Sequence, residues 1–177
     1  MTEALAPWHD FYTLVGGAAA TLIGLLFVAI SVTSATLNSS TASTRRWQVL
    51  RVYFSPSVVH LASVLATSLI MLAPIHGPSV LAAMIGLVGG CGLAYAAIVW
   101  RGMIRSGLWA TVGTEDRILY AAQPTVGHAL ILGAAAALAD GLAAGCAAIA
   151  FAIVLLLLTA IRNAWDITVW LLIRRES

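Results

Sequence analysis

The chain has 177 residues, of which 61% are hydrophobic and 9% are charged, and its formal net charge is +2. Domains that fold in water carry about 25% charged residues, so this composition excludes an ordinary water-exposed domain and predicts a protein mostly surrounded by lipid. All nine basic residues are Arg, in short clusters between apolar runs, and this spacing indicates membrane topology and no nucleic-acid-binding patch.

Five apolar segments are long enough to cross a bilayer, for which a helix needs about 20 residues. They are expected at residues 11–37, 52–73, 79–100, 117–139 and 142–161. Thr114-Glu-Asp116 indicates the start of the fourth helix, because threonine caps and acidic residues favour the amino end of a helix. Residues 162–175 are expected to extend the fifth helix along or beyond the inner membrane surface. We therefore predict an all-α fold, in which residues 1–177 form a single transmembrane domain of five helices.

The boundary near Asp140 decides the number of spans. If residues 117–161 formed one helix, it would be about 67 Å long at 1.5 Å per residue. A hydrocarbon layer of about 30 Å cannot cover that length. Asp140-Gly141 is typical of a tight turn, so two helices are favoured. A four-helix chain with a re-entrant segment is the alternative.

The distribution of charge predicts the orientation. With five spans every Arg falls on one side of the membrane, whereas Glu3, Asp10, His76 and Asp140 fall on the other. Positive residues are retained in the cytoplasm, so the amino terminus is expected outside and the carboxyl terminus in the cytoplasm. Four spans would place Arg174 and Arg175 outside the cell. The charge pattern therefore favours an odd number of spans.

The second predicted helix has a polar face, whose residues recur every three or four positions and so point one way. They are Ser57, His60, Ser63 and Thr67. His128 of the fourth helix is expected at a similar depth to His60, roughly 12–16 Å from the cytoplasmic end. One interpretation is a water-filled pathway in which the histidines titrate or contact an ion. The other is that Ser, Thr and neutral His hydrogen-bond across packed helices.

Two helices carry small residues at every fourth position. They are Gly16, Ala20 and Gly24 in the first helix, and Gly86, Gly90 and Ala94 in the third. Such spacing lets helix backbones approach closely in lipid. The pattern fits packing within one subunit, and it also fits an interface between subunits.

Arg162 and Asp166 lie four residues apart and are expected to pair on one helix face. We interpret the pair as an anchor in the headgroup zone, with a gating latch as the alternative. No catalytic residue is predicted, because the sequence has no serine-hydrolase, zinc-protease, C-x-x-C or phosphate-loop motif. The histidines are scattered, whereas a metal site needs three or four converging ligands, so no metal or other cofactor is expected.

The segment Trp8-His-Asp-Phe-Tyr12 is followed by Gly16-Gly-Ala-Ala-Ala20 and by Gly24-Leu-Leu-Phe-Val-Ala29. This segment resembles the first helix of small uncharacterised bacterial multi-pass inner-membrane proteins. The resemblance covers about the first thirty residues. It implies a location in the bacterial cytoplasmic membrane and no particular activity.

A chain with so little mass outside the membrane acts mainly through its lipid-embedded surfaces. We therefore hypothesise a homo-oligomeric membrane protein that forms a channel-like or transport pathway for ions or small solutes, lined by the polar face. The alternative is a non-conducting scaffold or regulatory subunit that binds another membrane protein through its glycine stripes. A membrane-embedded enzyme is the third hypothesis. The expected partners are the lipid bilayer and further copies of the chain.

Overall fold

The structure, a computed structural model, describes residues 6–36, 43–74, 77–105, 118–140 and 144–173. It describes side chains in 6–32, 56–74, 77–105, 119–140 and 144–166. The predicted helix start at Thr114, the turn residue Gly141, and Glu3, His76, Arg117, Arg174 and Arg175 lie outside the described residues. So do the side chains of Arg45, Arg46 and Arg51.

Five long α-helices make up most of the described chain, with no strand among the described residues. They are α2 (His9–Thr36), α3 (Ser43–Leu72), α4 (Pro78–Arg105), α7 (Gln123–Ala139) and α8 (Ala144–Ile173). A short 3-10 helix, η1 (Ala6–Trp8), precedes α2, and a π-helical turn, η2 (Ile118–Ala122), leads into α7. The all-α prediction is therefore confirmed for the described residues.

Four segments are long and apolar enough to cross a membrane: Ala6–Val32, Pro78–Arg105, Leu119–Ala139 and Ala144–Asp166. In α3 the apolar part with described side chains, Pro56–Leu72, is shorter than a full span. The helix as a whole has 30 residues and is therefore about 45 Å long. The structure thus has four helices long and apolar enough to span a membrane, and a fifth crossing by α3 stays a prediction.

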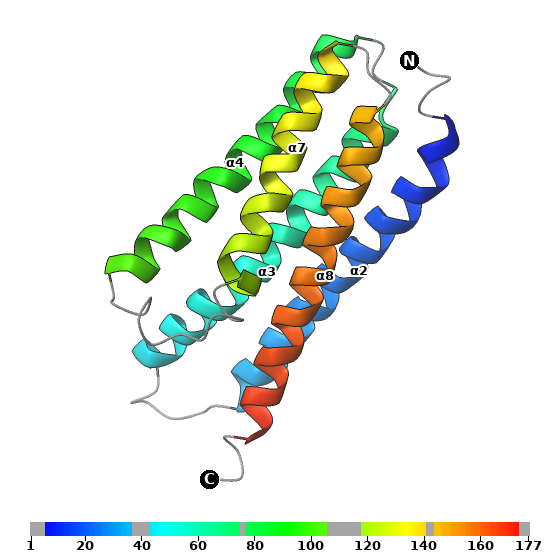
Figure 1. The fold of residues 1–177 in the computed structure, drawn as a ribbon. Helices are drawn as coiled ribbons and strands as arrows, with labels where there is room; N and C mark the ends of the chain where they lie inside the picture. Colours follow the sequence, from blue (N-terminus) through cyan, green and yellow to red (C-terminus); the bar gives the residue numbers. More distant parts are fainter. Residues whose placement is uncertain (1–5, 37–42, 75–76, 106–117, 141–143, 174–177) are drawn as a thin grey trace.

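Successive long helices run in opposite directions, so α2 begins at one end of the bundle and α8 finishes at the other (Figure 1). The two helices favoured over a single long one are present, because α7 ends at Ala139 and α8 starts at Ala144. The backbone N–H of Asp140 donates to Ala136 O at 3.2 Å and closes the last turn of α7. Arg101 and Arg105 lie at the end of α4, at the same end of the bundle as the last turns of α8 (Figure 1).

Four of the helices form a ring in which α3 contacts α4, α4 contacts α7, α7 contacts α8, and α8 contacts α3. The helix α2 lies outside the ring and packs mainly against α3. Leu61, Val64, Ile131 and Leu156 are buried between the packed helices, each 2% exposed or less. Large apolar side chains such as Leu14, at 73% exposed, cover the outside. An apolar exterior of this kind fits surrounding lipid.

The small-residue stripes pack against neighbouring helices only in part. Gly16 packs closely against Ser68 of α3, where an added Cβ would lie 2.9 Å from the serine Cβ. Gly86 of α4 faces α7 at ordinary contact distance. By contrast, Gly24 and Gly90 face open space, with nothing within 4 Å of an added Cβ. Ala20 and Ala94 are exposed as well. Packing within one subunit was therefore the wrong interpretation for these last four residues.

Helix geometry explains the difference. Residues spaced strictly by four turn about 40° further around an α-helix at each step, so such a stripe leaves the contact face. The buried residues of α4 alternate steps of three and four from Ala82 onward, and they are Ala82, Ile85, Gly89, Gly92 and Ala96, with Leu81 buried beside Ala82. At Gly89 an added Cβ would lie 2.8 Å from Leu132 N, so the backbones of α4 and α7 are close at this point.

Candidate functional site

The polar face of α3 lies inside the protein. Ser57 and Thr67 are 0% exposed, His60 is 3% exposed and Ser63 is 8% exposed. His128 of α7 is also 0% exposed, and three further polar residues are buried in α3 and α8: Ser68, Thr159 and Asn163. All five residues of the predicted pathway are therefore enclosed by the helices of a single chain.

His60 and His128 form a pair in the middle of the ring, with their ring centroids 5.6 Å apart and their planes tilted by 47°. They come from α3 and α7, which lie diagonally across the ring. Gly92 of α4 makes room for the second imidazole, because an added Cβ there would overlap the His128 ring. The pair therefore depends on α4, because the residue of α4 that contacts His128 is a glycine.

Both ring nitrogens of His128 have partners. Nδ1 lies 2.8 Å from Pro124 O, one turn earlier in α7, and Nε2 lies 3.2 Å from Ser63 Oγ in α3. The Ser63 hydroxyl also lies 2.9 Å from Val59 O, to which it donates. His128 therefore joins α7 to the polar face of α3 through a hydrogen bond in the interior.

Other polar atoms of the interior have no hydrogen-bond partner among the described residues. They are Ser57 Oγ, His60 Nδ1 and Nε2, Thr67 Oγ1, Ser68 Oγ, and the side-chain amide of Asn163. By contrast, the hydroxyls of Thr13, Thr21 and Thr159 have hydrogen-bond partners, because each donates to the backbone carbonyl oxygen four residues earlier. The unpartnered groups thus lie on α3, apart from the amide of Asn163 on α8.

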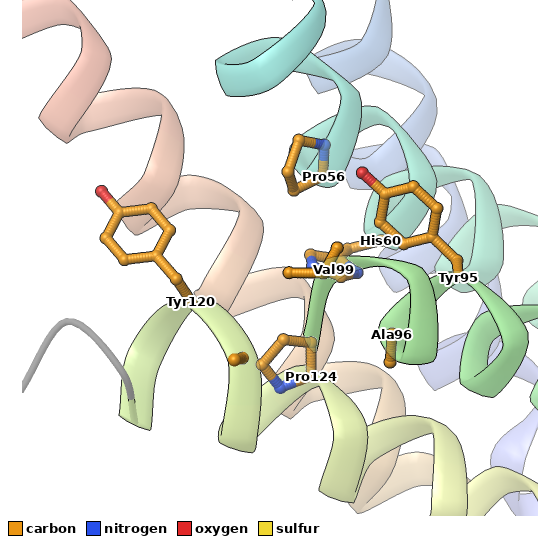
Figure 2. A pocket seen from close by; sticks show the side chains of 8 residues that line it. Pro56, His60, Tyr95, Ala96, Val99, Tyr120 and Pro124 are labelled. Atoms are coloured by element: carbon orange, nitrogen blue, oxygen red, sulfur yellow. The ribbon is translucent and has the colours of Figure 1, made fainter. Parts of the chain in front are cut away.

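A cavity lies beside His60, lined by α3, α4, η2 and α7 (Figure 2). The space open to the centre of a water molecule is about 10 Å³, roughly what one water needs. Pro56 and Pro124 both line it. Pro56 lies inside α3, where proline has no N–H and so breaks one backbone hydrogen bond of the helix. Pro124 is the second residue of α7, a first-turn position where proline is tolerated, and it directly follows the π-helical turn η2.

Tyr120 lines the cavity on the side away from His60 and connects it to α8 (Figure 2). Its hydroxyl donates to Asp166 Oδ2 at 2.9 Å, and Arg162 Nε lies 3.8 Å from the same oxygen. The side chains of Arg162 and Asp166 are 51% and 37% exposed. The predicted ion pair is therefore present, and it reaches the cavity through a tyrosine that the sequence analysis missed.

A short repeat in the sequence was also missed. Pro56-Ser-Val-Val-His60 in α3 and Pro124-Thr-Val-Gly-His128 in α7 share the pattern proline, hydroxyl residue, valine, any residue, histidine. The two copies lie on diagonal helices, and their prolines line one cavity while their histidines meet. Comparing the two helices with one another, instead of examining each alone, would have revealed this signal.

The described residues hold no group of three or more His, Cys, Asp or Glu side chains placed to bind a metal ion. Cys91 and Cys146 are free thiols, the first exposed and the second buried. Comparisons with protein-family models, with curated proteins and with solved structures found no match to this chain. The geometry of the site is therefore the basis for assigning a function.

Proposed function

We propose that this protein is a membrane transport protein whose pathway for ions or small polar solutes runs through the interior of one chain. The pathway follows the polar face of α3 and passes the histidine pair, His60 and His128. The observation that carries the proposal is the unpartnered polar groups inside the ring: Ser57 Oγ, Thr67 Oγ1 and both nitrogens of His60.

The energetic argument is that unpartnered polar groups destabilise a packed interior. Each buried group without a hydrogen bond costs about 1–3 kcal/mol relative to a satisfied one. Alanine, valine or leucine at these positions would avoid that cost. Polar and ionisable residues within a membrane protein are expected where a solute or water passes, because the passing species supplies the missing partners.

One end of the proposed pathway has polar groups up to the surface. It starts at the exposed pair of Arg162 and Asp166, continues through Tyr120 and the cavity, and reaches His60. Towards the opposite end the interior is apolar, with Met71, Leu81 and Leu138 buried. The path therefore has a polar entrance and an apolar barrier. We place the entrance in the cytoplasm, because Arg101 and Arg105 of α4 and Arg162 of α8, the arginines with described side chains, lie at that end.

Copies of the chain are proposed to associate in the bacterial cytoplasmic membrane through the exposed small residues of α2. Gly17 and Gly24 lie on the outer surface with open space around them, and Ala20 between them is also exposed. The same surface supports the second candidate function, a non-conducting scaffold that binds another membrane protein. A scaffold predicts a co-purifying partner and no solute flux from the purified chain.

The experiment compares Thr67→Val with Thr21→Val in purified protein reconstituted into liposomes, with K⁺, Na⁺, Cl⁻, H⁺ and glycerol flux measured in parallel. Valine has nearly the shape of threonine, so Thr67→Val removes an unpartnered buried hydroxyl without leaving a hole. Thr21 is exposed and its hydroxyl is already bonded to Gly17 O, so its replacement is the matched control.

We expect wild type and Thr21→Val to pass at least one of these species. Thr67→Val should unfold at the same or a higher temperature than wild type and yet show a several-fold lower flux. Loss of flux without loss of stability separates a transport role from a packing role. If no species crosses liposomes that contain wild-type protein, the transport proposal fails and the scaffold is favoured.

A further inference from the structure

The hydrogen atoms around His128 can be counted from the three polar contacts there. Nδ1 contacts Pro124 O, Nε2 contacts Ser63 Oγ, and Ser63 Oγ contacts Val59 O. Each contact needs one hydrogen between its two atoms. The two carbonyl oxygens only accept, so all three contacts can be hydrogen bonds only if Nδ1 donates to Pro124 O and the Ser63 hydroxyl donates to Val59 O.

A neutral imidazole has one N–H and a serine has one O–H, which together supply two hydrogens for three contacts. The Ser63 hydroxyl then donates either to His128 Nε2 or to Val59 O, and the other contact is lost. A doubly protonated His128 supplies two N–H groups, so that all three contacts become hydrogen bonds. The arrangement around His128 is therefore complete only when the ring carries an additional proton.

From this geometry we infer that the species the protein binds and transfers is the proton, held by the histidine pair with Ser63 as a switch. The inference rests on the proposed transport function and names its substrate. When a proton arrives at Nε2 of His128, the Ser63 hydroxyl turns from donating to Nε2 to donating to Val59 O. Its oxygen then accepts the new N–H. When the proton leaves, the hydroxyl turns back.

His60 is the neighbouring group from which that proton comes, and a water molecule in the adjoining cavity carries it, because neither His60 nitrogen is within hydrogen-bond distance of His128. The nitrogens of His60 have no partner among the described residues, and its ring lies between the cavity and His128. A neutral imidazole takes a proton on one nitrogen and releases a different proton from the other, so the ring is neutral again after the transfer. Two cations with ring centroids 5.6 Å apart would repel strongly in a low-dielectric interior, so the pair holds one extra proton at a time.

The titratable groups that face the pair come from each neighbouring element. Tyr95 of α4 and Tyr120 of η2 line the cavity with His60, and Asp166 of α8 lies behind Tyr120. No carboxylate among the described residues bonds to either histidine, so the charged form of the pair has no permanent counter-ion there. This arrangement favours a transient proton over a permanently bound cation.

A metal cation is the competing occupant, since two imidazoles also suit a transition metal. Both nitrogens of His128 are already engaged, however, and a third ligand is missing from the described residues. A proton adds a bond to Ser63, whereas a metal would displace one. The structure thus favours the proton, and EDTA in the assay distinguishes the two occupants.

The experiment measures proton flux into liposomes that hold a pH-sensitive dye, with a potassium gradient and valinomycin setting the voltage. The variants are His60→Gln, His128→Gln and Ser63→Ala, and the matched control is Ser68→Ala. Ser68 is a buried serine of the same helix that packs against Gly16, away from the histidines. We expect proton flux to fall by about tenfold or more in the three variants. Ser68→Ala and added EDTA should leave it unchanged.

A second measurement does not depend on transport. In protein labelled with ¹⁵N-histidine, the ring-nitrogen signals of neutral His128 should show Nδ1 protonated. Lowering the pH from about 8 to about 3 should convert one buried ring, and not both, to the doubly protonated form. Ser63→Ala should move that conversion to lower pH, because the charged ring loses its acceptor.

The outcomes separate the two proposals. If wild type passes another solute but no protons, or if EDTA abolishes proton flux, the proton inference is overturned and the transport function stands. The proton inference is also overturned if His60→Gln and His128→Gln conduct protons at the wild-type rate. If nothing crosses the membrane, both proposals fail. If neither buried ring gains a proton over the pH range, the switch at Ser63 is refuted whatever the flux.

Discussion

Replacing Gly92 by alanine should disrupt the histidine pair, although the change adds a single methyl group. The new Cβ would overlap the imidazole of His128. The ring is held on its other sides, because Nδ1 lies 2.8 Å from Pro124 O and Nε2 lies 3.2 Å from Ser63 Oγ. It therefore moves away from α4 only by losing at least one of these contacts.

The magnitude follows from two costs. Overpacking a filled interior costs about 1–3 kcal/mol, and leaving a buried polar group unpaired costs about 1–3 kcal/mol. Gly92→Ala should therefore lower the free energy of unfolding by about 2–6 kcal/mol. At about 2–4 °C per kcal/mol for a chain of this size, even the smallest value lowers Tm by about 4–8 °C.

The assay is thermal unfolding in detergent, followed by the fluorescence of the six tryptophans. The matched control is Gly90→Ala, two residues away on the same helix, where an added Cβ meets nothing within 4 Å. Alanine also favours a helix over glycine, so this control should keep Tm or raise it slightly. Equal Tm values for the two variants would refute the claim that His128 is wedged against α4.

Two further substitutions test hydrogen bonds made by buried or half-buried tyrosines. Tyr12→Phe removes the bond from the tyrosine hydroxyl to Cys146 O, 3.1 Å long, and should lower the free energy of unfolding by about 1 kcal/mol, measured by the same thermal assay. A change of Tm within experimental error would contradict that bond. Tyr120→Phe keeps the ring that lines the cavity but removes the bond to Asp166, so proton flux should fall several-fold while Tm changes little. Unchanged flux would remove Tyr120 from the proposed pathway.

The local elements of this protein follow from its sequence. Long apolar runs predict helices, and Asp140 with Gly141 predicts the break that separates α7 from α8. The spacing of Ser57, His60 and Ser63 places them on one side of α3, since residues three or four apart share a helix face. Spacing of this kind also predicts the contact between Arg162 and Asp166. These conclusions need only interactions between residues close together in the chain.

The direction in which each face points could not be predicted in the same way. In a protein surrounded by water, apolar residues turn inward and hydropathy separates the core from the surface. Lipid is as apolar as the interior, so an apolar face gives no such information in a membrane. The stripe of Gly24 and the stripe of Gly90 therefore fit either packing within one subunit or an interface between subunits by sequence, and the structure shows both residues facing outward, whereas Gly89 and Gly92 make the close contacts.

From the sequence alone one can infer that the chain is apolar enough for lipid, approximately where its long helices lie, and which residues share a helix face. The start of α3 at Ser43 and the end of α4 at Arg105, by contrast, lie beyond the predicted bounds. The tertiary structure adds that α3 turns its polar face into the protein and that His60 meets His128 there. Hydropathy and helical spacing depend on neighbours along the chain. The meeting of two histidines depends on how four helices cross one another, which is fixed by the shapes of all the side chains between them.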